Sequence, residues 1–401
     1  MNYDALLAAR TENMKASAIR ETLKVASQPG IVSLAGGVPD PAGFPLEIIR
    51  ELSSKVVDKY PETAFQYGPT EGFPPLREVL ADRLAQAGTV VDRDELLIFS
   101  GSQGVLDALG KVLISQGDKV VVETPTYLGA LQAFNAYGPS YLCMDSDENG
   151  PVPASLAGVL EQNDVKFVYL VPTFQNPTGR TISLERRKEI AQLLRLHNVL
   201  LIEDDPYSSL RYEGTHQPTL KSMAPDHVVY VGSLSKVFAP GFRLGFAAAP
   251  GILARWLVIA KQGVDLHTGS FSQALAAEYL AGGHLDTHVP RLIERYKPKR
   301  DAMLNALDRH FPSDFKWSRP EGGMFVWVEG TKGIDMDEVY KRSIARSVAF
   351  LPGRYFFARD GEGRETMRLN FSKADSDTIE QAIRILSEEV DRVPGRSVLA
   401  G

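Results

Sequence analysis

The chain has 401 residues, of which 44% are hydrophobic, and it carries a formal net charge of −6. This length is enough to bury a large core in two domains, and the negative charge without a long basic run argues against nucleic acid and anionic membranes as partners. The single cysteine, Cys143, excludes internal disulfides and cysteine metal clusters. The N-terminus does not resemble a secretory signal, and no apolar run is long enough to span a membrane. Together these features predict a cytoplasmic protein.

The first predicted element is a short helix at residues 17–26, with Ile19 on its apolar face and Arg20 on another face. Composition alone favours a solvated surface arginine. Residues 31–39 follow as an extended segment, in which Gly37 permits either a close approach of the backbone to a ligand or a simple turn.

Two amphipathic helices are predicted at residues 46–60 and 76–87. Tyr67 lies between them in a loop rich in glycine and proline, outside any periodic apolar run. Its position favours a subunit interface or a ligand as much as an ordinary core contact.

A strand at residues 96–99 leads through a loop with Ser102 and Gln103 into a helix at 105–113. The unpaired N–H groups and the dipole at such a helix start form an anion site, although Ser102 is equally suited to cap the helix. The loop matches neither the dinucleotide fingerprint nor a Walker loop.

Two further strands, 119–122 and 166–171, each precede a group that suits a flat heterocycle. Tyr127 follows the first strand and can stack on a ring or pack against a helix. Asn176 follows the second strand in an Asn-Pro-Thr-Gly turn, and its amide can donate a hydrogen bond to a phenolate oxygen.

After a predicted helix at 184–195, a buried strand at 199–202 runs into Asp204 and Tyr207. A carboxylate at the end of a buried strand is costly unless it is paired or functional. The nearest histidines do not have the spacing of metal ligands, so we expect no metal site.

The strand at 228–231 precedes two serines, a lysine and an arginine, namely Ser233, Ser235, Lys236 and Arg243. The hydroxyls and the guanidinium can hold a phosphate while the amine beside them acts as a nucleophile, as pyridoxal phosphate (PLP) requires of its Schiff-base lysine. Taken alone, a solvated loop lysine is the commoner explanation.

Strands and helices alternate from residue 96 to residue 231, which predicts an α/β fold with a mostly parallel sheet and helices on both faces. Ligands of such sheets bind at the C-terminal ends of the strands. Six candidate residues each follow a predicted strand and are therefore expected to meet: Ser102, Tyr127, Asn176, Asp204, Tyr207 and Lys236.

Helical residues 252–307 precede strands at 322–328 and 366–372, which predict a smaller α+β domain. In the second strand Arg368 points away from the apolar side. We expect an N-terminal segment (1–45) that packs with the small domain, a large PLP-binding domain (46–280) and a C-terminal small domain (281–401).

Several motifs in this order make the chain resemble a fold-type I PLP-dependent aminotransferase of class I/II across nearly its whole length. Its N-terminal half is especially similar to the 2-aminoadipate and kynurenine aminotransferase branch. The motifs are Ser17-Ala-Ile-Arg20-Glu21, Leu34-Ala-Gly-Gly37, Gln66-Tyr67-Gly-Pro-Thr-Glu-Gly72, Gly101-Ser-Gln103-Gly, Asn176-Pro-Thr-Gly179, Asp204-Asp-Pro-Tyr207 and Ser233-Leu-Ser-Lys236. Gly104 departs from close relatives, which often carry glutamine or alanine there.

The resemblance implies a role for each matching residue. Lys236 would hold PLP as a Schiff base, Asp204 would pair with the pyridinium nitrogen, and Asn176 and Tyr207 would donate to the phenolate oxygen while Tyr127 stacks on the ring. The residues implied to hold the phosphate are Ser102, Gln103, Ser233, Ser235 and Arg243, with Tyr67 reaching in from a partner subunit. The residues implied to bind substrate are Ser17, Arg20, Gly37, Asn176 and Arg368.

The implied activity is a two-stage ping-pong transamination between an L-amino acid and a 2-oxo acid such as 2-oxoglutarate, in a homodimer that shares its active sites. Arg368 would bind the α-carboxylate, and Arg20 would bind a distal carboxylate or swing aside for apolar side chains. The family also commonly has cis bonds at positions matching Thr124–Pro125 and Asn176–Pro177.

Three alternatives compete with this interpretation. Ser233-Leu-Ser-Lys236 also matches the Ser-x-x-Lys of penicillin-binding enzymes, but their Ser-Asp-Asn and Lys-Thr-Gly elements do not occur in the sequence. A PLP-fold regulator with a DNA-binding domain is disfavoured because Arg20 lies too near the N-terminus to leave room for that domain. Racemases, lyases and decarboxylases of the same fold are excluded least well.

Overall fold

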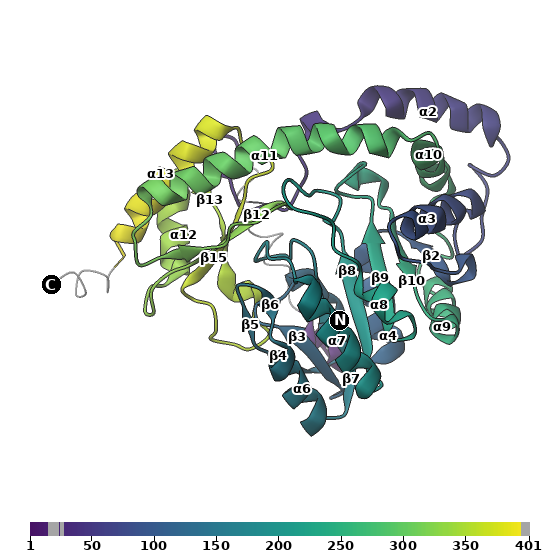
Figure 1. The fold of residues 1–401 in the computed structure, drawn as a ribbon, viewed down its shortest axis with the longest axis horizontal. Coiled ribbons are helices and arrows are strands. Elements are labelled where there is room, and N and C mark those ends of the chain that lie inside the picture. Colours follow the sequence, from purple (N-terminus) through teal and green to yellow (C-terminus); the bar gives the residue numbers. More distant parts are fainter. Residues whose placement is uncertain (15–23, 25–27, 394–401) are drawn as a thin grey trace.

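The computed structural model describes residues 1–14, 24 and 28–393. This part of the chain contains two main sheets, one of seven strands and one of four (Figure 1). Ser17, Arg20 and nearly all of the helix predicted at 17–26 lie outside the described residues.

The larger sheet has the strand order β2-β10-β9-β8-β7-β3-β4. Its strands are β2 (Leu96–Phe99), β3 (Lys119–Glu123), β4 (Ser140–Met144), β7 (Val165–Leu170), β8 (Leu200–Asp205), β9 (Val228–Ser233) and β10 (Gly245–Ala248). Strand β10 is antiparallel to both of its neighbours, and all other neighbouring pairs are parallel. The predicted mostly parallel α/β sheet is thereby confirmed.

Helices cover both faces of this sheet, because its side chains are apolar on both faces. One face carries α4 (Ser102–Leu113), α5 (Leu128–Asn135) and α9 (Gly251–Gln262), and the other carries α6 (Pro153–Gln162), α7 (Leu184–Leu196) and α8 (Leu220–Met223). Along β7, Phe167 and Tyr169 belong to the first core, whereas Val168 and Leu170 belong to the second.

The smaller sheet is antiparallel and has the order β11-β12-β15-β14. Its strands are β11 (Lys316–Trp317), β12 (Phe325–Glu329), β14 (Leu351–Pro352) and β15 (Thr366–Asn370), and the helices near it are α12 (Met336–Ala345) and α13 (Ser376–Asp391). Every residue of β15 is buried, so Arg368 faces protein on the polar side of its strand. Short strands β1 (Val32–Ser33) and β13 (Val348–Ala349) pair in parallel beside this sheet.

Helix α11 (His284–His310) connects the two halves and runs from α10 (Ser270–Ala281) to the neighbourhood of α13 (Figure 1). Near it lies α2 (Leu46–Lys59), while α3 (Pro74–Gln86) packs beside α10. The sequence predicted one helical region over 252–307, and the structure divides it into α9, α10 and α11.

Residues 34–40, which we call the strap, pass from the small sheet toward the large one. Asn370 N donates to Leu34 O at 2.8 Å, and Ser372 Oγ donates to Val38 O at 2.7 Å. At its end Asp40 accepts a hydrogen bond from Lys299 Nζ of α11 at 2.9 Å. The strap is therefore fixed to the small sheet and to α11.

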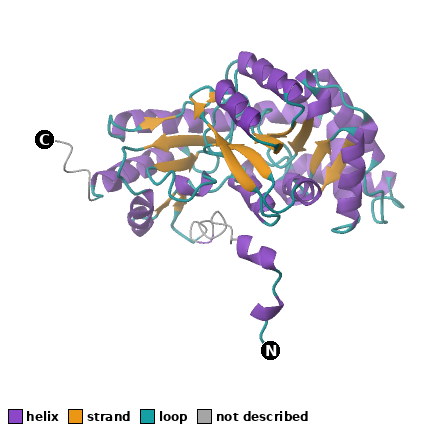
Figure 2. Ribbon diagram, turned by 90° about the horizontal axis from the view of Figure 1, so that it is seen from below, coloured by secondary structure: helices purple, strands orange, loops and turns teal. Residues whose placement is uncertain are grey.

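The two short helical turns η1 (Asp4–Leu6) and η2 (Ala9–Asn13) bury no residue and stand apart from the main body (Figure 2). Within the described residues, no helix is both long enough and apolar enough to cross a membrane.

Candidate active site

A cavity of about 250 Å³ lies where the strands of the large sheet end. Most of the predicted site residues line it, and they come from strand ends, loops and helix starts that are far apart in sequence. They are Ser102, Gln103, Tyr127, Asn176, Asp204, Tyr207, Ser233, Ser235, Lys236 and Arg243. The expectation that these side chains meet at one edge of the sheet is confirmed by this geometry.

Gly37 and Arg368 join the same site through hydrogen bonds. Lys236 Nζ donates to Gly37 O at 2.7 Å, and Arg368 Nη1 donates to Asn176 Oδ1 at 2.8 Å. Tyr67 does not lie at this cavity. Its side chain is 79% exposed and its ring packs edge-on against His267 with centroids 5.7 Å apart.

One end of the cavity is suited to an anion. Helix α4 begins at Ser102, and Gly101 precedes it with a φ of 93° that a side chain would strain. A Cβ atom at Gly101 would overlap the guanidinium of Arg243, so the glycine lets the cation lie close to the helix start. The free N–H groups of that first turn, the dipole of α4 and Arg243 together favour a phosphate.

Asp204 lies inside β8, one residue before its end, rather than after the strand as the sequence indicated. Its Oδ2 accepts a hydrogen bond from Tyr169 at 2.8 Å, while its Oδ1 is buried and has no partner among the described residues. Burial raises the pKa of Asp204 to about 7, although the Tyr169 bond lowers it. A cationic N–H donor bound in the cavity would supply the hydrogen bond that this buried carboxylate oxygen lacks and would balance its charge.

Lys236 is the amine of the site. Burial, together with the nearby charges of Arg368 and Arg243, lowers its pKa to about 8. A substantial share of the side chain is therefore neutral near physiological pH, which is the nucleophilic form of an amine.

Arg368 is a buried cation held by neutral groups. It is 1% exposed, Nη2 donates to Ala35 O at 2.6 Å, and Nε has no partner within the described part of the chain. Its guanidinium lies 4.2 Å from the centroid of the Phe325 ring. Burial lowers the pKa of Arg368 to about 10. This arrangement leaves the cation available to a carboxylate that enters the site.

Asn176 and two tyrosines form the remaining wall. Asn176 contacts both Arg368 and Tyr207, and burial raises the pKa of the Tyr207 hydroxyl so that it stays protonated. Burial likewise raises the pKa of Tyr127 to about 12, so its hydroxyl is also neutral. The Thr124–Pro125 and Asn176–Pro177 bonds are cis, as the resemblance implies.

Known proteins that are similar to this chain in sequence and structure point to the same kind of site. The sequence profile described as aminotransferase class I and II matches residues 33–386. The chain belongs to this family. It is 43% identical over 397 residues to aromatic-amino-acid aminotransferase 1 of Thermococcus litoralis, a match that covers 97% of this chain and 95% of the relative.

A sequence and a crystal structure from Thermus thermophilus are also similar over nearly the whole chain. The 2-aminoadipate transaminase is 41% identical over 377 residues, which is 93% of each chain. The crystal structure of α-aminoadipate aminotransferase complexed with N-(5'-phosphopyridoxyl)-L-leucine superposes with a TM-score of 0.91 at 38% identity, covering 98% of this chain and 99% of that one.

Pyridoxal phosphate is therefore the cofactor of this aminotransferase, and the cavity fits it. The unpartnered Oδ1 of Asp204 suits the protonated pyridine nitrogen, and the α4 start with Arg243 suits the phosphate. Lys236 supplies the amine between these two ends.

The sequence analysis missed Tyr169, whose hydroxyl donates to Asp204. A usable signal was present, because Tyr169 and Asp204 lie near the ends of neighbouring parallel strands. Tyr169 is opposite Ile202 in the β7–β8 register, and Asp204 points to the same face as Ile202. A polar tyrosine on an otherwise apolar buried strand thus indicated a partner at the strand end.

Proposed function

We propose that this aminotransferase moves an amino group from an L-amino acid to a 2-oxo acid such as 2-oxoglutarate by a ping-pong mechanism. The donors we propose are 2-aminoadipate, glutamate, aromatic and branched aliphatic amino acids. The aromatic and 2-aminoadipate donors are supported by the two similar relatives, an aromatic-amino-acid aminotransferase and a 2-aminoadipate transaminase.

The observation that carries the proposal is the arrangement of Arg368 beside Lys236 in one buried site. Arg368 has no carboxylate partner among the described residues and keeps one donor, Nε, free. An α-carboxylate bound there would bring the amino group of the substrate toward Lys236 and the cofactor.

In this proposal the other residues hold the cofactor in a fixed orientation. Asp204 keeps the ring nitrogen protonated, Tyr127 stacks on the ring, and Asn176 and Tyr207 donate to its oxygen. The phosphate is held by the residues at the start of α4 and in the lysine loop, namely Ser102, Gln103, Ser233, Ser235 and Arg243. When bound, pyridoxal phosphate supplies the electron sink that acidifies the substrate Cα–H bond.

The chain's own proton carrier is Lys236. Its lowered pKa means that the free amine can accept the α-proton near neutral pH, and it would deliver that proton to C4′ of the cofactor in the same half-reaction. The second half-reaction would move a proton in the reverse direction. The strap excludes water from this step, because Val38 and Pro39 line the cavity beside the lysine.

We further propose a cytoplasmic homodimer in which Tyr67 of each subunit reaches the phosphate of its partner. Tyr67 is exposed, and Phe65 beside it is 65% exposed, which is unusual for two aromatic residues on one short loop. Trp256 and Ile252 on α9 add further exposed apolar surface.

One incubation tests the activity. The protein is mixed with a single L-amino acid and 2-oxoglutarate, and the new 2-oxo acid and glutamate are both quantified. Equal amounts of the two products are expected. Racemised donor, released ammonia or released carbon dioxide in their place would instead identify a racemase, a lyase or a decarboxylase.

A further inference from the structure

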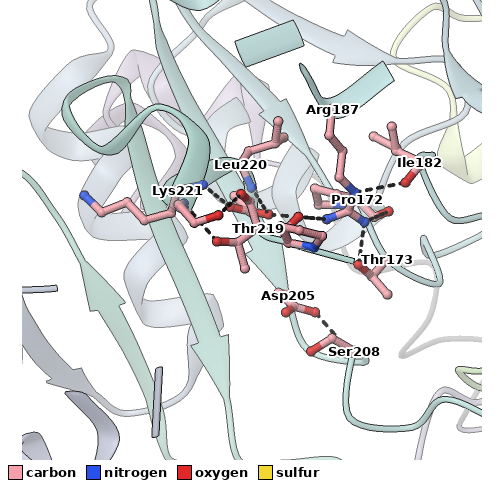
Figure 3. A network of polar contacts seen from close by, with 12 residues as sticks. Pro172, Thr173, Ile182, Arg187, Asp205, Ser208, Thr219, Leu220 and Lys221 are labelled. Atoms are coloured by element: carbon pink, nitrogen blue, oxygen red, sulfur yellow. Dashed lines mark hydrogen bonds and ion pairs between the residues drawn. The ribbon is translucent and has the colours of Figure 1, made fainter. Parts of the chain in front are cut away.

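Arg187 on α7 is a fully buried arginine that touches no residue of the cavity. Its Nε donates to Ile182 O at 2.9 Å, and its Nη2 donates to Pro172 O and to Thr173 Oγ1, both at 2.8 Å. Figure 3 shows Ile182 and Pro172 together on one side of the guanidinium, with Thr173 below it. The side chain is only 1% exposed.

These three partners are the two ends of one loop. The loop of residues 172–182 leaves the end of β7, carries Asn176 at its tip and returns toward α7. Its ends also meet directly, since Ile182 N donates to Pro172 O at 2.9 Å. The planar guanidinium therefore ties both ends of the loop at the same point.

The loop needs such an outside constraint. Phe174, between Thr173 and Asn176, has a φ of 50°, which is the left-handed region that a bulky residue adopts only at a free-energy cost. A strained residue keeps its conformation when the surrounding contacts determine it. Arg187 supplies three of those contacts, two directly before Phe174 at Pro172 and Thr173 and one at Ile182, where the loop ends.

The charge of Arg187 is balanced on the side away from the loop. Glu203 Oε1 lies 4.0 Å from its Nη1, which also donates to Pro218 O at 3.0 Å. Glu203 itself accepts from the N–H groups of Leu220 and Lys221 at 3.0 and 2.8 Å. A cation placed here is thus stable without any partner in the cavity.

We propose that Arg187 is a positioning residue of this aminotransferase, which holds the Asn176 amide in place through the loop of residues 172–182. The proposal rests on the role proposed above for Asn176 at the ring oxygen of the cofactor. Arg187 lies on α7, which covers the opposite face of the sheet, and its bonds to Pro172, Thr173 and Ile182 reach the cavity through the loop that carries Asn176. Lysine at this position would keep the charge beside Glu203, but a single ammonium cannot serve both ends of the loop.

The experiment measures the absorbance of the bound cofactor in the resting holoenzyme as a function of pH. A hydrogen bond from Asn176 to the ring oxygen favours its anionic form, so Asn176→Ala should raise the midpoint of the spectral transition by on the order of one pH unit. Arg187→Lys should raise the midpoint in the same direction by about half that amount, because the amide is misplaced rather than removed.

The matched control is Arg186→Lys on the same helix. Arg186 is half-buried, pairs with Asp147 at 2.6 Å and also donates to Gly150 O and Pro151 O. None of these partners belongs to the loop of residues 172–182, so the variant should leave the midpoint unchanged. Thr173→Val is a second test variant, since it removes one acceptor of Arg187 and retains the ion pair with Glu203. Thr173→Val should raise the midpoint of the spectral transition by less than Arg187→Lys does.

Different outcomes would overturn the proposed role of Asn176 and the proposed role of Arg187. An unchanged midpoint in Asn176→Ala overturns the role of Asn176 itself. A shift in Asn176→Ala with none in Arg187→Lys, or equal shifts in Arg187→Lys and Arg186→Lys, overturns the positioning role of Arg187. If Arg187→Lys does not fold, Thr173→Val decides the question in the same way.

Discussion

Lys236 Nζ lies 2.7 Å from the carbonyl oxygen of Gly37, 199 residues away in the chain. The lysine follows β9 of the large sheet, whereas Gly37 belongs to the strap that Asn370 fixes to the small sheet. The nucleophile is thus held at the point where the two halves of the protein meet. Any ligand that takes the place of Gly37 O at the amine also changes a contact between those halves.

Lys236→Ala should abolish transamination and the near-visible Schiff-base (aldimine) absorbance, because no other described lysine lines the cavity. Lys341→Ala is the control, since Lys341 is exposed and pairs only with Glu338. The measurement is the spectrum of each variant after borohydride treatment and dialysis. Absorbance retained by Lys236→Ala would refute the assignment.

Asp204→Asn should retain some cofactor but slow Cα deprotonation severely, because an unprotonated pyridine withdraws electrons poorly. Asp205→Asn is the matched control. Its carboxylate is already occupied by Tyr230 at 2.9 Å and by Ser208 N at 3.1 Å, away from the cavity. Single-turnover rates with a deuterated donor measure the step. Greater damage from the Asp205 change would show that the wrong aspartate has been assigned.

The raised pKa of Asp204 also predicts how the apoprotein responds to pH. Between the unfolded value of 3.8 and the folded value of about 7, the folded state binds more protons than the unfolded state at this residue. Its contribution is therefore fully present below pH 3.8 and is lost as pH rises through about 7. Relative to Asp204→Asn, the wild-type apoprotein should lose on the order of 4 kcal/mol of unfolding free energy between pH 4 and pH 7.5.

Denaturant unfolding of both apoproteins at a series of pH values measures this difference. The comparison with Asp204→Asn is needed because burial raises the pKa values of Glu123 and Glu203 as well, to about 8 and about 7. If the difference in unfolding free energy between the two apoproteins stays constant from pH 4 to pH 7.5, Asp204 titrates near its ordinary pKa.

Much of the fold and the site followed from local patterns. Apolar runs predicted the strands that deliver Ser102, Asn176 and Lys236, and the rule that ligands gather at the ends of parallel strands brought them to one edge. Strand β10 was missed because its residues, Gly-Phe-Ala-Ala, are too small and too few to give a period.

What the sequence could not supply were contacts between distant segments. The bond between Gly37 and Lys236 joins two motifs that the sequence marks separately, but their contact depends on tertiary packing. The contact of Arg187 with its loop depends on tertiary packing as well, and Arg187 belongs to no motif that marks it. For Asp204 the motif was found, but the strand was predicted too short because acids are rare in strands. Its pairing with Tyr169 explains why the strand continues through it.

The last prediction concerns substrate choice and Arg20, which lies outside the described residues. In the branch that the chain resembles, the matching arginine can bind the distal carboxylate of the substrate. Arg20→Ala should therefore raise KM for glutamate and 2-aminoadipate by roughly tenfold or more, while turnover of leucine and phenylalanine changes little. Arg10→Ala is the control, since Arg10 is an exposed arginine of the same N-terminal region. Steady-state kinetics with all four donors distinguishes a substrate-binding role of Arg20 from a structural one. Equal losses of kcat/KM for acidic and apolar donors would leave Arg20 with a structural role only.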